Sequence, residues 1–175
     1  MENIPQIKEQ LQKALHVVRT AEKYEETALL IAQKLGLQGE KRRLRYESAK
    51  NHILANKIRT CAYDEYLITL SDDYQKVSLP ELSSFKMFFE TYLAKMEEEY
   101  DALHTIANAL VVLNARHFAQ KLYHKCDCLM DDIVYYNRSI SEGNIANWRP
   151  EWVFLHQTTM ANTHDEYEKK ENGLG

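Results

Sequence analysis

The chain has 175 residues, of which 45% are hydrophobic and 27% are charged, and its formal net charge is −4. This length and composition fit one folded domain and exclude a wholly disordered chain. The acidic balance argues against a general attraction to nucleic acid, and no apolar run reaches the roughly 20 residues of a membrane-spanning helix.

The distribution of Gly and Pro predicts long helices. There are only 5 Gly and 3 Pro, and most lie at the edges of long stretches that lack both. We therefore predict an all-α fold, an antiparallel bundle of about four long helices over residues 1–143. An aromatic segment over 144–166 should form a short fifth helix or arm that packs on the bundle or on a partner, and residues 167–175 should be frayed.

The cysteine count indicates the compartment. Three cysteines, in a chain whose first 15 residues are amphipathic and lack an apolar signal core, predict reduced thiols and a cytoplasmic protein.

The first helix is predicted from Pro5 to Leu35, with Asn3 as N-cap and Gly36 just beyond its end. Its buried seam advances by three and four residues. Glu25 is the one polar member of that seam. Its members are Ile4, Ile7, Leu11, Ala14, Val18, Ala21, Glu25, Ala28, Ala32 and Leu35. A carboxylate on such a seam needs a compensating partner, because an unpaired buried charge costs several kcal/mol.

The second helix is predicted over residues 40–67, after a turn at Gly36–Gly39. Glu47, Ser48 and Asn51 fall on its apolar stripe. Its first turn carries a basic stretch, Lys41, Arg42, Arg43 and Arg45. We interpret this stretch as a solvated basic turn, with a phosphate- or RNA-binding site as the alternative.

Two further helices are predicted after a connection over residues 68–79. The third should begin at a capping box, Ser78-Leu79-Pro80-Glu81. A turn is expected near Asn114, because one uninterrupted helix to Glu142 would be roughly 90 Å long at 1.5 Å per residue. The fourth helix should carry an apolar stripe from Phe118 to Ile140 and end at Gly143.

A hairpin of the first two helices places Glu25 level with Lys50, with Glu47 and Asn51 within one turn. Glu99 of the third helix belongs to the same layer. One interpretation is an ion pair that fixes helix register. The alternative is a site for Fe, Mn or Zn that uses Glu25, Glu47 and Glu99, which resembles the carboxylate di-metal centres of ferritin-like bundles. This sequence lacks the Glu-x-x-His pairs of those centres, and its connection between the second and third helices is short for their crossover. No other cofactor is indicated.

A second, weaker metal cluster is predicted on the outer faces of the third and fourth helices. It consists of Glu97, Asp101, His104, His124, Asp127 and Asp131, which a hairpin about Asn114 brings level with one another. The alternative interpretation is a solvated polar face.

The aromatic C-terminal segment supplies residues typical of interface anchors, namely Trp148, Arg149, Trp152 and Phe154. No Gly-rich phosphate loop and no nucleophile in a recognisable catalytic context is present. We therefore expect a non-enzymatic protein that binds a protein partner or associates with itself. A carboxylate-rich metal-binding bundle and an RNA- or phosphate-binding helical protein are the alternatives.

Overall fold

The computed structural model describes residues 3–82 and 84–142. It contains four helices, α1 (Ile4–Lys34), α2 (Gln38–Tyr66), α3 (Phe85–Val112) and α4 (Arg116–Glu142), and this part of the chain has no strand. The predicted all-α class and the four long helices are thereby confirmed. The predicted fifth helix, the 144–166 arm and the 167–175 tail lie outside the described residues.

The turn between α1 and α2 is shorter than predicted. Gly36 adopts a left-handed backbone conformation with φ of 76°, which a residue without Cβ accepts readily. Helix α2 then begins at Gln38, so Gly39 lies inside it rather than in the turn. Asn3 precedes α1 as predicted, but its side chain makes no capping hydrogen bond.

Helix α3 begins later than predicted, and the capping-box prediction at Ser78 was wrong. The helix begins at Phe85, after Ser84, whose hydroxyl accepts a hydrogen bond from the Met87 N–H at 3.1 Å. Tertiary packing overrides the local signal, because Leu82 is buried against the core while the chain is still extended. The connection from α2 to α3 therefore spans residues 67–84 rather than 68–79, and the prediction that it is short for a crossover was wrong.

The predicted break near Asn114 is confirmed. Asn114 has a φ of 62°, a left-handed conformation that asparagine tolerates better than most residues. The Ala115 N–H then donates to the Leu110 carbonyl at 2.8 Å, which closes the end of α3.

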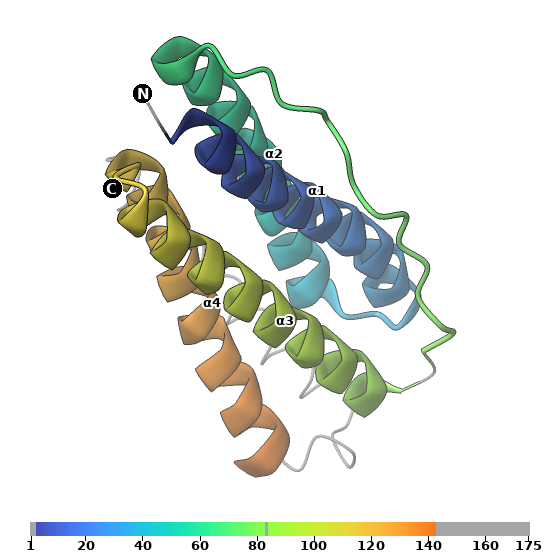
Figure 1. Ribbon diagram of the computed structural model, residues 1–175. Coiled ribbons are helices and arrows are strands. Elements are labelled where there is room, and N and C mark those ends of the chain that lie inside the picture. The colour runs from blue at the N-terminus through green and yellow to red at the C-terminus, as the bar shows by residue number, and fades with distance from the viewer. Residues whose placement is uncertain (1–2, 83, 143–175) are drawn as a thin grey trace, which may run out of the picture.

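Residues 67–84 form a crossover that runs along the bundle, so that α2 and α3 point in the same direction (Figure 1). The crossover is attached to α1 along its course. The Gln12 side chain bonds to the backbone of Ser71, Arg19 bonds to Asp72, and the Gln75 N–H donates to Thr20. Helices α1 and α2 pack closely, as do α3 with α4 and α1 with α3.

Long polar side chains connect α2 to α4 in pairs. As the residue number of the partner on α2 increases, that of its partner on α4 decreases. The pairs are Glu40 with Tyr136, Arg43 with Asp132, Glu47 with Lys125, and Glu65 with His117. These two helices therefore run in opposite directions, with polar pairs along their length.

The core draws buried apolar residues from all four helices. Leu11, Leu15 and Val18 of α1 are buried together with Phe88, Phe89 and Tyr92 of α3 and with Phe118, Leu122 and Tyr136 of α4. Across the described ranges, no helix combines the length and apolarity that a membrane crossing requires.

Candidate functional site

One ionisable side chain from each helix reaches the same region of the interior. Glu25 comes from α1, Glu47 from α2, Glu99 from α3 and Lys125 from α4. The exposed fractions of Glu25, Glu47 and Lys125 are only 3%, 4% and 5%. Glu99 is partly buried, but its Oε1 atom is enclosed. We call these four residues the central cluster.

Direct contacts hold part of the central cluster together. The Lys125 ammonium donates to Glu47 Oε2 at 3.1 Å, and Lys50 Nζ lies 3.9 Å from the other oxygen of Glu47. The Asn51 amide donates to Glu25 Oε1 at 2.6 Å. The prediction that Glu25 is buried beside the first half of α2 is thus confirmed, and its hydrogen-bond donor is a neutral amide.

The electrostatics of the central cluster favour an uncharged Glu25. Burial raises the pKa of Glu25 well above its ordinary value, and the charges of Glu47 and Glu99 add to the rise, while Lys125 opposes it. The pKa of Glu99 is raised for the same main reason, burial. Burial alone would lower the pKa of Lys125, but Glu47, Glu99 and Glu25 outweigh burial and raise it, so the ammonium stays charged.

Enclosed carboxylate oxygens without a hydrogen-bond donor occur in the central cluster, and two of them belong to residues that line a pocket. Among the residues that the structure describes, Glu25 Oε2 and Glu99 Oε1 are enclosed and have no hydrogen-bond partner. Buried polar atoms are nearly always satisfied in folded proteins, so each exception calls for an explanation such as a bound molecule.

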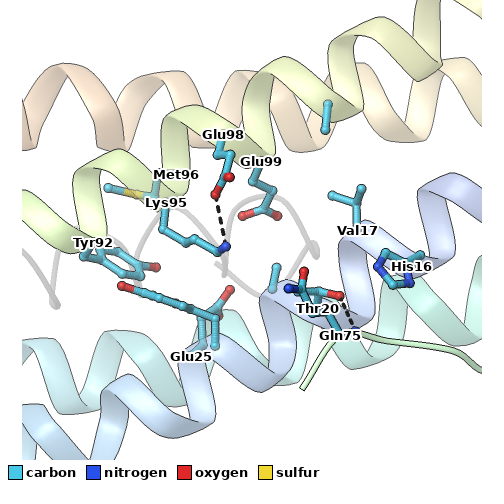
Figure 2. A pocket seen from close by; sticks show the side chains of 13 residues that line it. His16, Val17, Thr20, Glu25, Gln75, Tyr92, Lys95, Met96, Glu98 and Glu99 are labelled. Carbon is cyan, nitrogen blue, oxygen red and sulfur yellow. Dashed lines mark hydrogen bonds and ion pairs between the residues drawn. The ribbon is translucent and has the colours of Figure 1, made fainter. Parts of the chain in front are cut away.

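A pocket of about 200 Å³ adjoins both of these residues, between α1, α3 and the crossover. Figure 2 shows the carboxylates of Glu25 and Glu99 turned toward the same space from the two helices. In this view the Lys95 ammonium projects into the same space, and it donates to Glu98 at 3.0 Å. Its charge lowers the pKa of Glu99, against the effect of burial. The remaining lining is mixed aromatic, apolar and polar: Tyr24, Tyr92, Val17, Ala21, Met96, Ala102, His16, Thr20 and Gln75.

A second buried charged group lies one helical turn away along α2. The Arg43 guanidinium, 1% exposed, contacts Glu40 at 3.3 Å and Asp132 at 3.4 Å. It also lies over the ring of Tyr92 at 4.6 Å and that of Tyr136 at 5.3 Å, and the Tyr136 hydroxyl donates to Glu40. Burial would lower the pKa of Arg43, but Glu40 outweighs it and the pKa is raised, so the guanidinium stays charged.

This placement corrects the prediction for the basic stretch. Arg43 is an internal structural cation and cannot serve a phosphate at the surface. Arg42 and Arg45 are exposed and Lys41 is partly exposed, so the four residues do not form one surface group.

The predicted metal ligands Glu25, Glu47 and Glu99 do come together, but their surroundings do not fit a metal ion. Over residues 3–82 and 84–142, no three His, Cys, Asp or Glu side chains are arranged to hold one. The ammonium of Lys125 already lies against Glu47 and faces the other two carboxylates. Histidine, the ligand that completes carboxylate di-metal centres, is replaced at the expected spacing by Lys50.

The second predicted metal cluster lies on the outside of the α3–α4 hairpin. Five of its members are exposed: Glu97, Asp101, His124, Asp127 and Asp131. The sixth, His104, is partly buried and stacks on Tyr100, with ring centroids 5.5 Å apart. The structure thus gives these six residues no common metal-binding geometry in the part of the chain it describes.

Sequence reasoning missed Lys125 and the Arg43 group. The available signal for Lys125 was the one that identified Glu25, a charged residue on an otherwise apolar seam, here between Leu122 and Leu129. The Arg43 group carried no such signal, because its partners come from two helices that are far apart in sequence.

Comparison with known proteins supplies no relative from which an activity could be transferred. No family model matches the chain, and no curated protein matches it either. The predicted partner-binding residues Trp148, Arg149, Trp152 and Phe154 lie outside the described residues. The function is therefore argued from the central cluster and its pocket.

The raised pKa of Glu25 predicts how stability depends on pH. A carboxyl group whose pKa is higher in the folded than in the unfolded state contributes stability below its ordinary value of 4.5, and loses it as the pH rises through the folded value. We expect Glu25→Gln to remove this loss, so that between pH 5 and pH 8 the stability of the variant falls less than that of the wild type. Urea unfolding at pH 5 and pH 8 measures the free energy of unfolding of both proteins. Glu26→Gln, at the exposed neighbouring position, is the control. Parallel pH profiles for wild type and Glu25→Gln would contradict the assignment.

Proposed function

We propose that the protein binds a small primary amine, in its ammonium form, in the pocket between α1 and α3. One observation carries the proposal, namely the two enclosed carboxylate oxygens without donors, Glu25 Oε2 and Glu99 Oε1, at this pocket. An ammonium group has three N–H donors and a positive charge, so it satisfies both oxygens and favours their ionised form.

The charge balance of the central cluster supports a cationic ligand. Three carboxylates, Glu25, Glu47 and Glu99, face the ammonium groups of Lys125 and Lys50. A third ammonium, that of Lys95, also faces Glu99 but is paired with the carboxylate of Glu98. One negative charge is left over when all seven groups are ionised. The free protein suppresses it by holding a proton, in line with the raised pKa of Glu25. A bound ammonium would replace that proton.

The pocket lining supports an organic cation rather than a bare ion. Val17, Ala21 and Met96 offer apolar contact to a short alkyl chain. The aromatic rings of the lining already lie against internal cations, Tyr24 against Lys95 at 5.7 Å and Tyr92 against Arg43 at 4.6 Å. The volume of about 200 Å³ is below the roughly 300–1,000 Å³ of pockets for drug-sized ligands, so the ligand should be small.

The experiment compares n-butylamine with 1-butanol, which has a similar shape but no charge, by NMR titration at pH 7.5. We expect the amine to shift resonances around the pocket and the alcohol to bind much more weakly. Glu25→Gln and Glu99→Gln should each weaken amine binding about ten- to hundredfold, the worth of a charge-assisted hydrogen bond.

Glu97→Gln is the matched control, because Glu97 is exposed on α3 and does not line the pocket. It should change amine affinity by less than about fivefold. Equal binding of amine and alcohol, or unchanged affinity in both central variants, would overturn the proposal. So would stoichiometric binding of Mn²⁺ or Zn²⁺ that blocks the amine.

A second candidate function is self-association through one end of the bundle. Val112 and Leu67 are 84% and 77% exposed. They lie at the same end, because the ring of Tyr66 stacks on that of Phe118 with centroids 6.1 Å apart. Exposed apolar side chains of this kind favour association with a second copy. Light scattering on the wild type and a Val112→Lys/Leu67→Lys variant tests it, and a monomeric wild type at high concentration would exclude it.

A further inference from the structure

The central cluster repeats, helix by helix, the residue spacing of a two-metal carboxylate centre. In ferritin-like bundles, two helices each supply one Glu, and the other two each supply a Glu-x-x-His pair. Here α1 supplies Glu25 and α3 supplies Glu99. Helix α2 supplies Glu47 with Lys50 three residues later, and α4 supplies Lys125 with Cys128 three residues later.

The course of the chain agrees with this comparison. Bundles of that kind have one long crossover connection. The connection over residues 67–84 runs along the bundle and leaves α2 and α3 pointing the same way (Figure 1). The contacts of Glu47 with Lys125 and of Glu25 with Asn51 place the polar positions of α1, α2 and α4 at the same level. Glu99 of α3 lines the same pocket as Glu25.

Two of the three differences from the two-metal pattern add positive charge, namely those at Lys125 and Lys50. A carboxylate position is held by Lys125, and the two imidazole positions are held by Lys50 and Cys128. Both lysines direct their ammonium groups to Glu47, at 3.1 Å and 3.9 Å. We infer that these two ammonium groups provide the positive charge that metal ions provide in a two-metal centre, so that the carboxylates of this bundle are held together without metal.

The inference predicts that three substitutions restore metal binding. Lys125→Glu, Lys50→His and Cys128→His together recreate two single Glu and two Glu-x-x-His pairs. Purified wild type and triple variant are titrated with Co²⁺, followed by visible absorption, and dialysed against Zn²⁺, followed by metal analysis. We expect less than about 0.1 metal ion per chain in the wild type, and one to two per chain in the variant with a higher Tm when metal is present.

The matched control makes the same three kinds of substitution away from the centre, as Lys121→Glu, Lys57→His and Cys61→His. It should bind no more metal than the wild type. The inference is overturned by stoichiometric metal in the wild type, by a folded triple variant that binds no more than the control, or by a triple variant that stays unfolded even with Zn²⁺. Amine binding by the wild type is measured in the absence of metal. A wild type that binds no amine would contradict the proposed function and leave this inference unaffected.

Discussion

Replacing Lys125 by methionine should lower the free energy of unfolding by about 3–5 kcal/mol, the usual cost of removing one partner of a buried ion pair. Methionine retains much of the side-chain volume but has no charge. Glu47 then loses its hydrogen bond to the ammonium at 3.1 Å, and the carboxylates of Glu25 and Glu99 lose the positive charge they face. Urea unfolding followed by circular dichroism at pH 7.5 measures the change.

Lys121→Met is the matched control, because Lys121 lies one turn earlier on α4 and is only partly buried. It should cost less than about 1 kcal/mol. The double variant Lys125→Met/Glu47→Leu should be more stable than Lys125→Met alone, since it removes the carboxylate left without its cation. A loss below about 1 kcal/mol in Lys125→Met would mean that the ammonium is not held in the interior.

Replacing Arg43 by methionine should also cost about 3–5 kcal/mol, because the guanidinium is the buried cation that faces two acids. Glu40 is completely buried and would retain only the hydrogen bond from Tyr136. The contacts of the guanidinium with the rings of Tyr92 and Tyr136 would be lost as well. The midpoint of urea unfolding, compared at an unchanged slope, reports the loss.

Arg45→Met is the control for this second variant, because Arg45 belongs to the same basic stretch but is exposed. Its effect should stay within about 0.5 kcal/mol. If the two arginine variants were equally stable, the assignment of Arg43 to the interior would be wrong.

The sequence predicts most of the helical frame, because local signals determine it. Gly36 and Asn114 mark the two tight turns, and both adopt the left-handed conformation that those residue types tolerate. The start of α3 was wrong because the Ser78 capping box competes with tertiary packing. The burial of Leu82 becomes favourable only once the crossover lies on the bundle, and the helix then begins after the cap at Ser84.

The candidate site was predicted only in part, for a physical reason. The position of Glu25 on an apolar seam is a property of one helix, and periodicity reveals it. What compensates the carboxylate depends on how α2 and α4 are aligned, and no local pattern encodes that alignment. Acidic residues on three helices therefore suggested a metal, whereas the structure has the ammonium of Lys125 in contact with one of them.

The crossover has a kinetic consequence for any molecule that enters the pocket. Gln75 lines the pocket and belongs to the exposed stretch over residues 71–76, which lies between the buried Leu70 and Leu82. Side-chain contacts with α1, rather than a helical backbone ladder, attach this stretch to the bundle. Breaking those contacts uncovers the side of the pocket that Gln75 lines, while α1 and α3 remain packed against each other. Exchange of a guest with solvent would then require only local detachment, and its rate could be altered at Arg19 or Thr20 without changing the global unfolding rate.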